Sequence, residues 1–207
     1  MADAQTDETG SAAGLAALIA RAAAQTNGKD KGPPPVERWN PPFCGDIDME
    51  IRSDGTWFYM GSPIGRQPLV RLFSTVLRKD EDGRIYLVTP VEKLGIRVVD
   101  APFVAVEMNV SERQGERIIT FRTNVGDIVE AGAEHPLRFV VHGENNELKP
   151  YLHVRGRLEA LVSRAVMYDL VALGETVDVD GISMFALRSG GQVFPVMPAG
   201  ELEALSS

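Results

Sequence analysis

GDIDMEIRSDGTWFYM, residues 45–60, predicts two antiparallel strands joined by a tight turn. Before the turn, Ile47, Met49 and Ile51 alternate with charged residues, which is the period of a strand with one buried face. Asp54-Gly55 favours a two-residue hairpin turn, because glycine accepts the positive φ angle that such a turn requires. The stretch therefore predicts a hairpin with one apolar and one charged side.

The two-residue turn also predicts which side chains share a face. It pairs Ile51 with Phe58, and so places Trp57 opposite Arg52 and puts Tyr59 on the same charged side. Large aromatic side chains on a charged sheet face are expected to be covered. We expect the cover to be the chain's own proline-rich segment or another part of the fold, and a ligand or partner is the alternative.

A weak internal duplication extends the pattern along the chain, with residues 54–98 placed over residues 145–196. The second copy has its own turn at Glu144 to Glu147. In each copy a Gly-Arg follows the turn, at Gly65-Arg66 and Gly156-Arg157, and each is expected to open a helix. The sequence thus predicts an α+β fold of two tandem repeats, each a mostly antiparallel sheet with one helix.

The residues before the first repeat predict a tail, a short helix and a strap. Leu15, Leu18, Ile19 and Ala22 recur at helical spacing, and residues 29–42 contain five prolines. The expected organisation is a disordered tail, short helix and linker at 1–35, a first repeat at 36–125, a second repeat at 126–198 and a C-terminal tail at 199–207.

Composition disfavours several classes of function. The chain has 29 acidic against 21 basic residues, and this net charge of −8 disfavours binding to nucleic acid or to an anionic membrane. Cys44 is the one cysteine, so no internal disulfide can form. The sequence has no apolar run long enough to span a membrane and no secretory signal, and the cytoplasm is the expected location.

The common catalytic motifs are missing from the sequence. It contains no phosphate-binding glycine motif, no Gly-x-Ser-x-Gly elbow and no His-Glu-x-x-His pair, and its histidines lack metal-ligand spacing. We therefore expect no catalytic residue, no metal and no cofactor. Asp46, Asp48 and Glu50 are alternate residues of one strand, so their carboxylates project from one face and could bind a divalent cation. The alternative is therefore a small metal-dependent hydrolase using Asp46 and Asp48, with Glu92 as a further candidate.

Four stretches carry a resemblance to a known family: NPPFCGDIDM at 40–49, DGTWFY at 54–59, PIGR at 63–66 and LVTPVEK at 87–93. In these the chain resembles the bacterial family called domain of unknown function 1285, over about residues 35 to 198. The resemblance implies an α+β fold built from a repeated motif and a part in signal transduction. The family supplies no catalytic residues to carry over.

These observations predict a non-enzymatic module that binds a small molecule or a protein. A structural adaptor that forms a homodimer through its N-terminal helix is a further hypothesis. The candidate ligand-binding residues are those of the charged hairpin face and the polar positions that follow it: Asp48, Trp57, Tyr59, Arg66, Arg71, Glu92 and Lys93.

Overall fold

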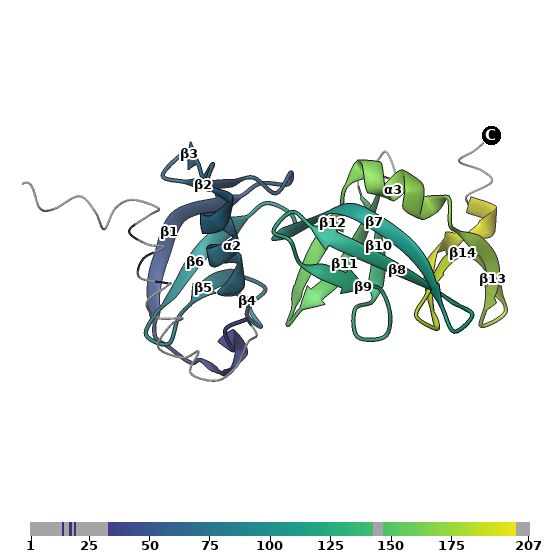
Figure 1. The fold of residues 1–207 in the computed structure, drawn as a ribbon, viewed down its shortest axis with the longest axis horizontal. Helices are drawn as coiled ribbons and strands as arrows, with labels where there is room; N and C mark the ends of the chain where they lie inside the picture. The colour runs from purple at the N-terminus through teal and green to yellow at the C-terminus, as the bar shows by residue number, and fades with distance from the viewer. Residues whose placement is uncertain (1–13, 15–16, 18, 20–32, 143–146, 202–207) are drawn as a thin grey trace, which may run out of the picture. The chain divides into compact units, whose positions relative to one another are not determined.

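The chain forms two compact units, residues 1–101 and 102–207 (Figure 1). The structure is a computed structural model that describes residues 14, 17, 19, 33–142 and 147–201. The expected boundary between residues 125 and 126 is wrong, because it falls in a turn between two paired strands, β8 (Glu116–Thr123) and β9 (Ile128–Glu130). Most of the short helix predicted near residues 15–22 lies outside the described residues.

The described residues of the first unit include a six-stranded sheet and a helix that packs on it. Its strand order is β3-β2-β1-β6-β5-β4, and all neighbours are antiparallel except β1 and β6. A helix, α2 (Gln67–Thr75), begins directly after Arg66, and a short 3-10 helix, η1 (Val36–Arg38), precedes the sheet. The strands are β1 (Phe43–Ile51), β2 (Trp57–Tyr59), β3 (Ser62–Pro63), β4 (Leu77–Lys79), β5 (Ile85–Val88) and β6 (Lys93–Val98).

The turn between β1 and β2 contains three residues, one more than the sequence predicts. Arg52 N donates to Thr56 O at 3.0 Å, and Gly55 N donates to Arg52 O at 2.9 Å. Gly55 has a φ of 81°, as in a turn that ends in a glycine bulge. The register therefore pairs Ile51 with Trp57 rather than with Phe58.

This one-residue shift exchanges the two faces of β2. Trp57 moves to the apolar side, where it is 1% exposed, and stacks on Phe73 of α2 with ring centroids 6.2 Å apart. Phe58 takes its place on the charged side, opposite Glu50 and under the Arg52 guanidinium, 3.6 Å from the ring centroid. The prediction that Trp57 lies on the charged face is wrong, and helix α2 covers it.

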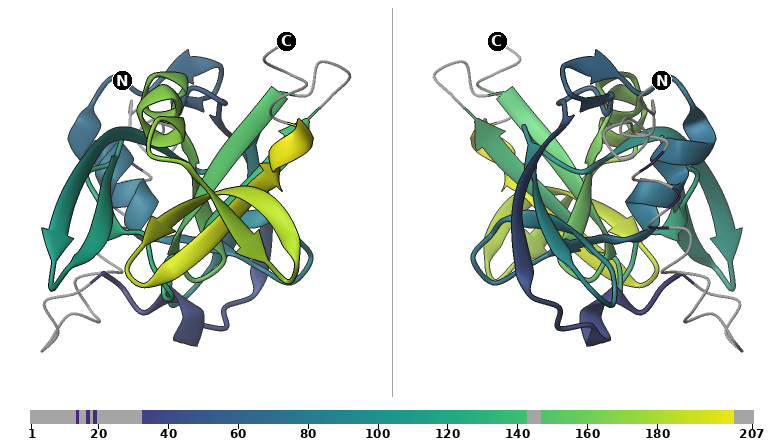
Figure 2. Two further views of the ribbon diagram at one scale, coloured as in Figure 1. Left: turned by 90° about the vertical axis from the view of Figure 1, so that its right-hand side faces the viewer. Right: turned by 90° about the vertical axis from the view of Figure 1, so that its left-hand side faces the viewer.

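The second unit contains a six-stranded sheet, a helix and a three-stranded sheet. The larger sheet has the order β10-β11-β12-β7-β8-β9, with β12 and β7 parallel, and the smaller one has the order β13-β14-β15. The left panel of Figure 2 looks onto the smaller sheet. The further elements are β7 (Phe103–Arg113), β10 (Leu137–His142), β11 (Glu147–Arg155), β12 (Leu158–Val162), α3 (Arg164–Val171), β13 (Glu175–Val179), β14 (Ile182–Ser189) and β15 (Gln192–Pro198).

Gly156-Arg157 does not open a helix, contrary to the prediction. It forms the turn between β11 and β12, and burial in the five residues of β12 alternates with the period of a strand. The helix α3 starts later, after Ser163, whose side chain accepts from Val166 N. The predicted turn at residues 144–147 lies largely outside the described residues.

Each unit nevertheless repeats one order of elements, namely a hairpin, a helix and a three-stranded meander. In the first unit these are β1–β2, α2 and β4 to β6, and in the second they are β11–β12, α3 and β13 to β15. Two tandem domains with this layout fit the predicted repeat, although strands dominate both more than the α+β prediction implies.

Ser189 fastens the smaller sheet of the second unit to the larger one. Ser189 is 1% exposed. Its hydroxyl donates to Ala131 O at 2.7 Å and accepts from Ile119 N at 2.9 Å. The next residue, Gly190, donates its N–H to Arg117 O at 3.0 Å. The turn between β14 and β15 is thus held against β8 by buried polar contacts.

Ser189→Ala should lower the free energy of unfolding of the second unit by about 1–3 kcal/mol. The substitution leaves a buried backbone N–H and a buried carbonyl without their partner, and such groups carry a desolvation penalty of that size. Urea unfolding would measure it. Ser183→Ala, at an exposed position of the same strand, is the control and should change stability by about 0.5 kcal/mol or less. Equal effects of the two would contradict this role.

Candidate binding site

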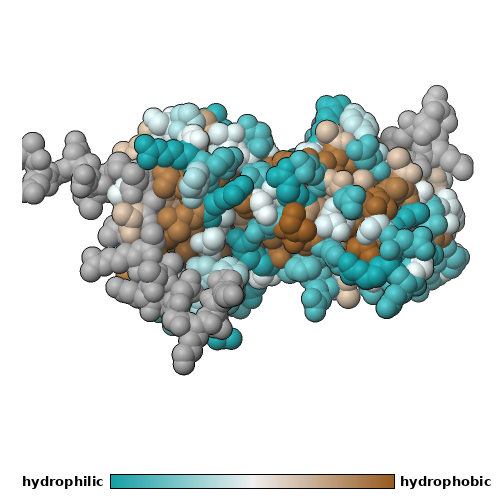
Figure 3. All heavy atoms as spheres, in the orientation of Figure 1, coloured by the Kyte–Doolittle hydropathy of each residue, from teal (hydrophilic) through white to brown (hydrophobic). Residues whose placement is uncertain are grey.

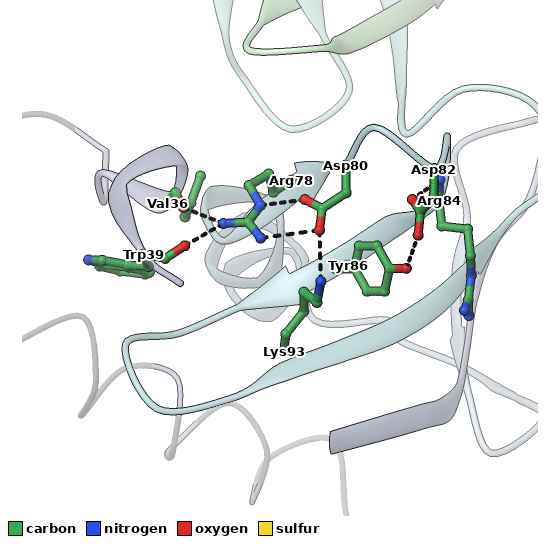
Figure 4. Close-up of polar contacts among 8 residues, drawn as sticks. All are labelled: Val36, Trp39, Arg78, Asp80, Asp82, Arg84, Tyr86 and Lys93. Atoms are coloured by element: carbon green, nitrogen blue, oxygen red, sulfur yellow. Dashed lines mark hydrogen bonds and ion pairs between the residues drawn. The ribbon is translucent and has the colours of Figure 1, made fainter. Parts of the chain in front are cut away.

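A partly buried charge cluster in the first unit surrounds Arg78 on β4 (Figure 4). Arg78 is 8% exposed and donates to the carbonyls of Val36 at 2.9 Å and Trp39 at 2.7 Å. It also donates to both carboxylate oxygens of Asp80, at 2.6 and 3.2 Å, and Lys93 Nζ donates to the same carboxylate at 2.9 Å. The cluster thereby holds η1 against the edge strand β4.

The acidic groups around this cluster are held in their charged form. Burial alone would raise the pKa of Asp80, but hydrogen bonds from Arg78 and Lys93 lower it below its usual value. The hydrogen bond from Tyr86 Oη to Asp82, at 2.5 Å, lowers the pKa of Asp82 and raises that of Tyr86. These shifts oppose proton exchange near neutral pH, so the cluster is suited to holding the strap rather than to acid-base chemistry.

The predicted ligand-binding residues lie in different surroundings. Lys93 belongs to the Arg78 cluster, and Glu92 caps a bend by donating its N–H to Thr89 Oγ1 at 3.2 Å. Tyr59 is half-buried opposite Met49. Three more are exposed, Asp48 on β1, Arg66 just before α2 and Arg71 on α2. A ligand role for any of them stays a prediction, and Trp57 is part of the core.

Two of the three carboxylates in the row Asp46, Asp48 and Glu50 on β1 are paired with arginines of the same unit. Asp46 pairs with Arg84, and Glu50 lies 3.5 Å from Arg97 and 3.9 Å from Arg52. Irregularities in the β1–β6 pairing also interrupt the row. Within the described ranges, no group of three or more histidines, cysteines or acidic residues could hold a metal ion.

In the second unit, the outer part of β7 has an edge that no described strand covers. β12 pairs with β7 only at Phe103, Val104 and Ala105, and the chain then leaves the sheet to form α3, a helix that packs against β7 without adding a strand to it. Beyond that point β8 is the one strand of the described chain that pairs with β7, and their hairpin extends toward the smaller sheet (Figure 1). We call residues 106–113 the β7 edge.

Hydrogen bonds on the far side of β8 show which of its residues face β7. Arg117 O accepts from Gly190 N, Ile119 bonds Ser189 and Ala131 through its backbone, and Thr123 N donates to Asp127 O. These odd-numbered residues therefore direct their backbone groups away from β7. Since the direction alternates along a strand, the even-numbered residues of β8 face β7.

The same alternation sets the direction of the β7 backbone. The even-numbered β8 residues pair with Glu107, Asn109 and Ser111, so those three bond inward to β8. Met108 and Val110, with Glu112 beyond them, must then direct their N–H and C=O groups outward. The β7 edge thus presents a row of backbone donors and acceptors to which no described strand is paired.

The side chains of the β7 edge combine exposed apolar groups with charges already paired in their own unit. Val106 and Val110 are 38% and 41% exposed. Arg122 donates to Glu107 and lowers its pKa, and Arg113 donates to Glu130 at 2.8 and 3.1 Å. On the face shown in Figure 3, hydrophobic residues appear in several separate areas between hydrophilic ones. An edge of this kind can accept another strand.

A pocket of about 440 Å³ opens near the end of the same hairpin. Its lining includes Glu116, Arg117, Glu175 and Arg188. Arg188 pairs with Glu175 at 2.5 Å, and Arg117 donates to Leu173 O at 3.0 Å. Its volume suits a small molecule, but both of its arginines are engaged within the chain.

Family comparisons cover nearly the whole described chain. The N-terminal domain model of the domain of unknown function DUF1285 matches residues 34–101, and the C-terminal domain model of that protein family matches residues 102–196. The chain belongs to the DUF1285 family. This confirms the resemblance seen in the sequence, and the two matched ranges meet where the structure divides the DUF1285 chain into its units.

Two solved structures of DUF1285 family proteins are similar to this chain. The one from Silicibacter pomeroyi DSS-3 is 51% identical with a TM-score of 0.77, covering 88% of this chain and 97% of its own. The one from Shewanella baltica OS155 is 23% identical with a TM-score of 0.47, covering 60% of this chain and 90% of its own. No curated protein matches the chain. Among the described residues of this DUF1285 protein, no helix is long and apolar enough to cross a membrane.

Proposed function

We propose that this DUF1285 family protein is a non-enzymatic protein-binding module that takes up an extended segment of a partner along the β7 edge. The observation that carries the proposal is the outward direction of the backbone groups of Met108, Val110 and Glu112. A partner strand laid beside them gains main-chain hydrogen bonds in regular register, as in other cases of strand addition.

The energetics favour a strand over a small ligand at this edge. Each main-chain hydrogen bond contributes about 0.5–1.5 kcal/mol net, and cross-strand side-chain pairs add about 0.2–1 kcal/mol each. Several consecutive hydrogen bonds and side-chain pairs are needed to offset the entropy lost when an extended segment becomes ordered. A strand that runs the length of the β7 edge supplies them, whereas a compact molecule reaches only one or two of the outward groups.

The side chains define the chemistry of the partner segment. Met108 and Val110 project from one face of the β7 edge, so the segment should carry apolar residues at alternate positions opposite them. On the other face, Glu107 and Arg113 lie near the two ends and accept a segment with one basic and one acidic end. An extended, alternating segment of mixed charge is the class of partner that fits.

Photo-cross-linking in cells tests the proposal. Benzoylphenylalanine placed at Asn109, which is exposed on the β7 edge, should form adducts with an extended segment of another protein. A synthetic peptide of that segment should then bind the purified protein. The control position is Ile182, an apolar residue that is 58% exposed on β14.

Val110→Pro should abolish both the adduct and the peptide binding, because it removes an outward N–H. Proline is tolerated on an edge strand where that N–H does not bond the neighbouring strand. Equal capture at Ile182, or peptide binding that survives Val110→Pro, would contradict the proposal. Adducts between two copies of the chain are scored separately.

A further inference from the structure

We infer that the β7 edge is self-complementary and that two copies of the chain pair through it, as an antiparallel dimer centred on Val110. The inference rests on the proposed function, since it uses the same edge. It goes further in naming the occupant, the register and a consequence for regulation.

The backbone directions permit this register. In an antiparallel pair centred on Val110, each Val110 faces the other, and Met108 faces Glu112 of the second copy. These are the three residues whose N–H and C=O groups point outward, and they fall at the hydrogen-bonded positions of the new pair. Every outward group of the three then has a partner.

The side chains at the intervening positions are complementary. The same register places Glu107 opposite Arg113 of the second copy and Asn109 opposite Ser111 of the second copy. These are the non-hydrogen-bonded positions, where Cα atoms approach to about 4.5 Å and side chains are closest. Opposite charges and hydrogen-bonding pairs are favourable there.

The charges then form a row that alternates across the dimer. Glu107 already pairs with Arg122, and Arg113 with Glu130. Joining the two copies gives a row of Arg122, Glu107, Arg113 of the second copy and Glu130 of the second copy. The dimer thus adds an attractive contact at each end of the pairing.

Other registers lose this match. Moving the centre to Asn109 or to Ser111 keeps the hydrogen-bonding pattern, but it places Glu107 opposite Ser111 or Gly115 of the second copy. In the register centred on Val110, the two Glu112 residues are four positions apart, about 13 Å at the rise of a strand. That exceeds the screening length of about 8 Å at physiological salt, so their repulsion is small.

Self-pairing has a regulatory consequence. The dimer occupies the same outward N–H and C=O groups that a partner segment would use, so the two modes of binding exclude each other. The partner must compete with a second copy, and its apparent affinity should fall as the concentration of the protein rises.

Cysteine cross-linking tests the register in the full chain. With the exposed Cys44 replaced in Cys44→Ser, protein carrying Asn109→Cys is mixed with protein carrying Ser111→Cys. The predicted register brings these two positions within disulfide range, and mild oxidation should give a mixed disulfide dimer. Dimers of Asn109→Cys alone or of Ser111→Cys alone would instead indicate a centre at Asn109 or Ser111, and either result would overturn the inference.

Sedimentation equilibrium tests whether the chain forms a dimer through the β7 edge. The wild-type chain should show a concentration-dependent dimer, and Val110→Pro should raise its dissociation constant at least tenfold while keeping a cooperative thermal transition. Glu112→Pro, which removes a different outward N–H, should do the same. A wild-type chain that stays monomeric, or a dimer that survives both substitutions, would overturn self-pairing. If benzoylphenylalanine at Asn109 still captures a partner sensitive to Val110→Pro, the proposed function stands without it.

Discussion

Trp57→Ala should lower the free energy of unfolding of the first unit by about 3–5 kcal/mol, the usual cost of truncating a fully buried tryptophan. Trp57 is 1% exposed and stacks on Phe73 at an interplanar angle of 18°, so its removal opens a cavity between β2 and α2. Single domains are stable by about 5–15 kcal/mol, and the loss would leave the unit marginal. Urea unfolding followed by tryptophan fluorescence would measure it, and this signal reports the first unit alone because both tryptophans of the chain, Trp39 and Trp57, belong to that unit.

Trp57→Phe is the matched control. It keeps an aromatic ring against Phe73 and removes the indole Nε1–H, which is buried with no hydrogen-bond partner among the described residues. We expect it to cost less than half as much as the alanine substitution. An alanine variant with a change of about 0.5 kcal/mol or less would show that Trp57 lies at the surface, as the two-residue turn would have it.

Arg78→Met should lower the stability of the first unit by about 3–5 kcal/mol, because it breaks one side of a buried ion pair. It leaves the Trp39 carbonyl without the Arg78 donor, removes one of two donors to the Val36 carbonyl, and leaves Asp80 with Lys93 alone. Chemical unfolding followed by tryptophan fluorescence would measure the loss. Arg78→Lys should recover only part of it, since an ammonium cannot reproduce the planar fork.

The stability of the Arg78→Met variant should depend less on pH than the stability of the wild type does. The folded-state pKa of Asp80 is lowered, so its contribution to stability is present above the unfolded pKa and is lost as pH falls through the folded value. Wild-type stability should therefore decline as pH falls below about 4, and Arg78→Met should decline less steeply. Arg97→Met, at an exposed arginine of the same sheet, should match wild type in both respects. A pH profile of Arg78→Met identical to wild type would contradict this account.

The sequence predicts the first hairpin correctly, but it does not predict which residues of the two strands pair. Asp54-Gly55 fits both a two-residue turn and a three-residue turn ending in a glycine bulge, and these differ by one residue in pairing. That one residue decides whether Trp57 or Phe58 faces the core. Trp57, which the sequence places on a recognition face, is therefore part of the hydrophobic core, where it packs against α2.

The prediction of a helix opening at Gly156-Arg157 in the second repeat is wrong for a related reason. Residues 158–166 place apolar side chains at spacings that fit a helix, but the first five of them also alternate as a strand. Pairing of β12 with both β11 and β7 decided in favour of the strand. The spacing of apolar residues alone does not contain that information.

The β7 edge could not be predicted from the sequence. Val106, Met108 and Val110 alternate with polar residues, a pattern typical of one buried face. Their exposure depends on where β12 ends and α3 begins, which is a property of the tertiary structure. Local sequence carries no signal for the end of a neighbouring strand.

Amide hydrogen exchange along β7 tests the central claim most directly. In dilute protein, the amides of Met108, Val110 and Glu112 should exchange quickly, while those of Asn109 and Ser111 stay protected by β8. Adding a peptide of the partner segment, or raising the protein concentration, should slow exchange at Met108, Val110 and Glu112. Exchange at Asn109 and Ser111 should stay unchanged. Protection of Met108, Val110 and Glu112 already in dilute monomer would show that the edge is covered within the chain, and would contradict the account.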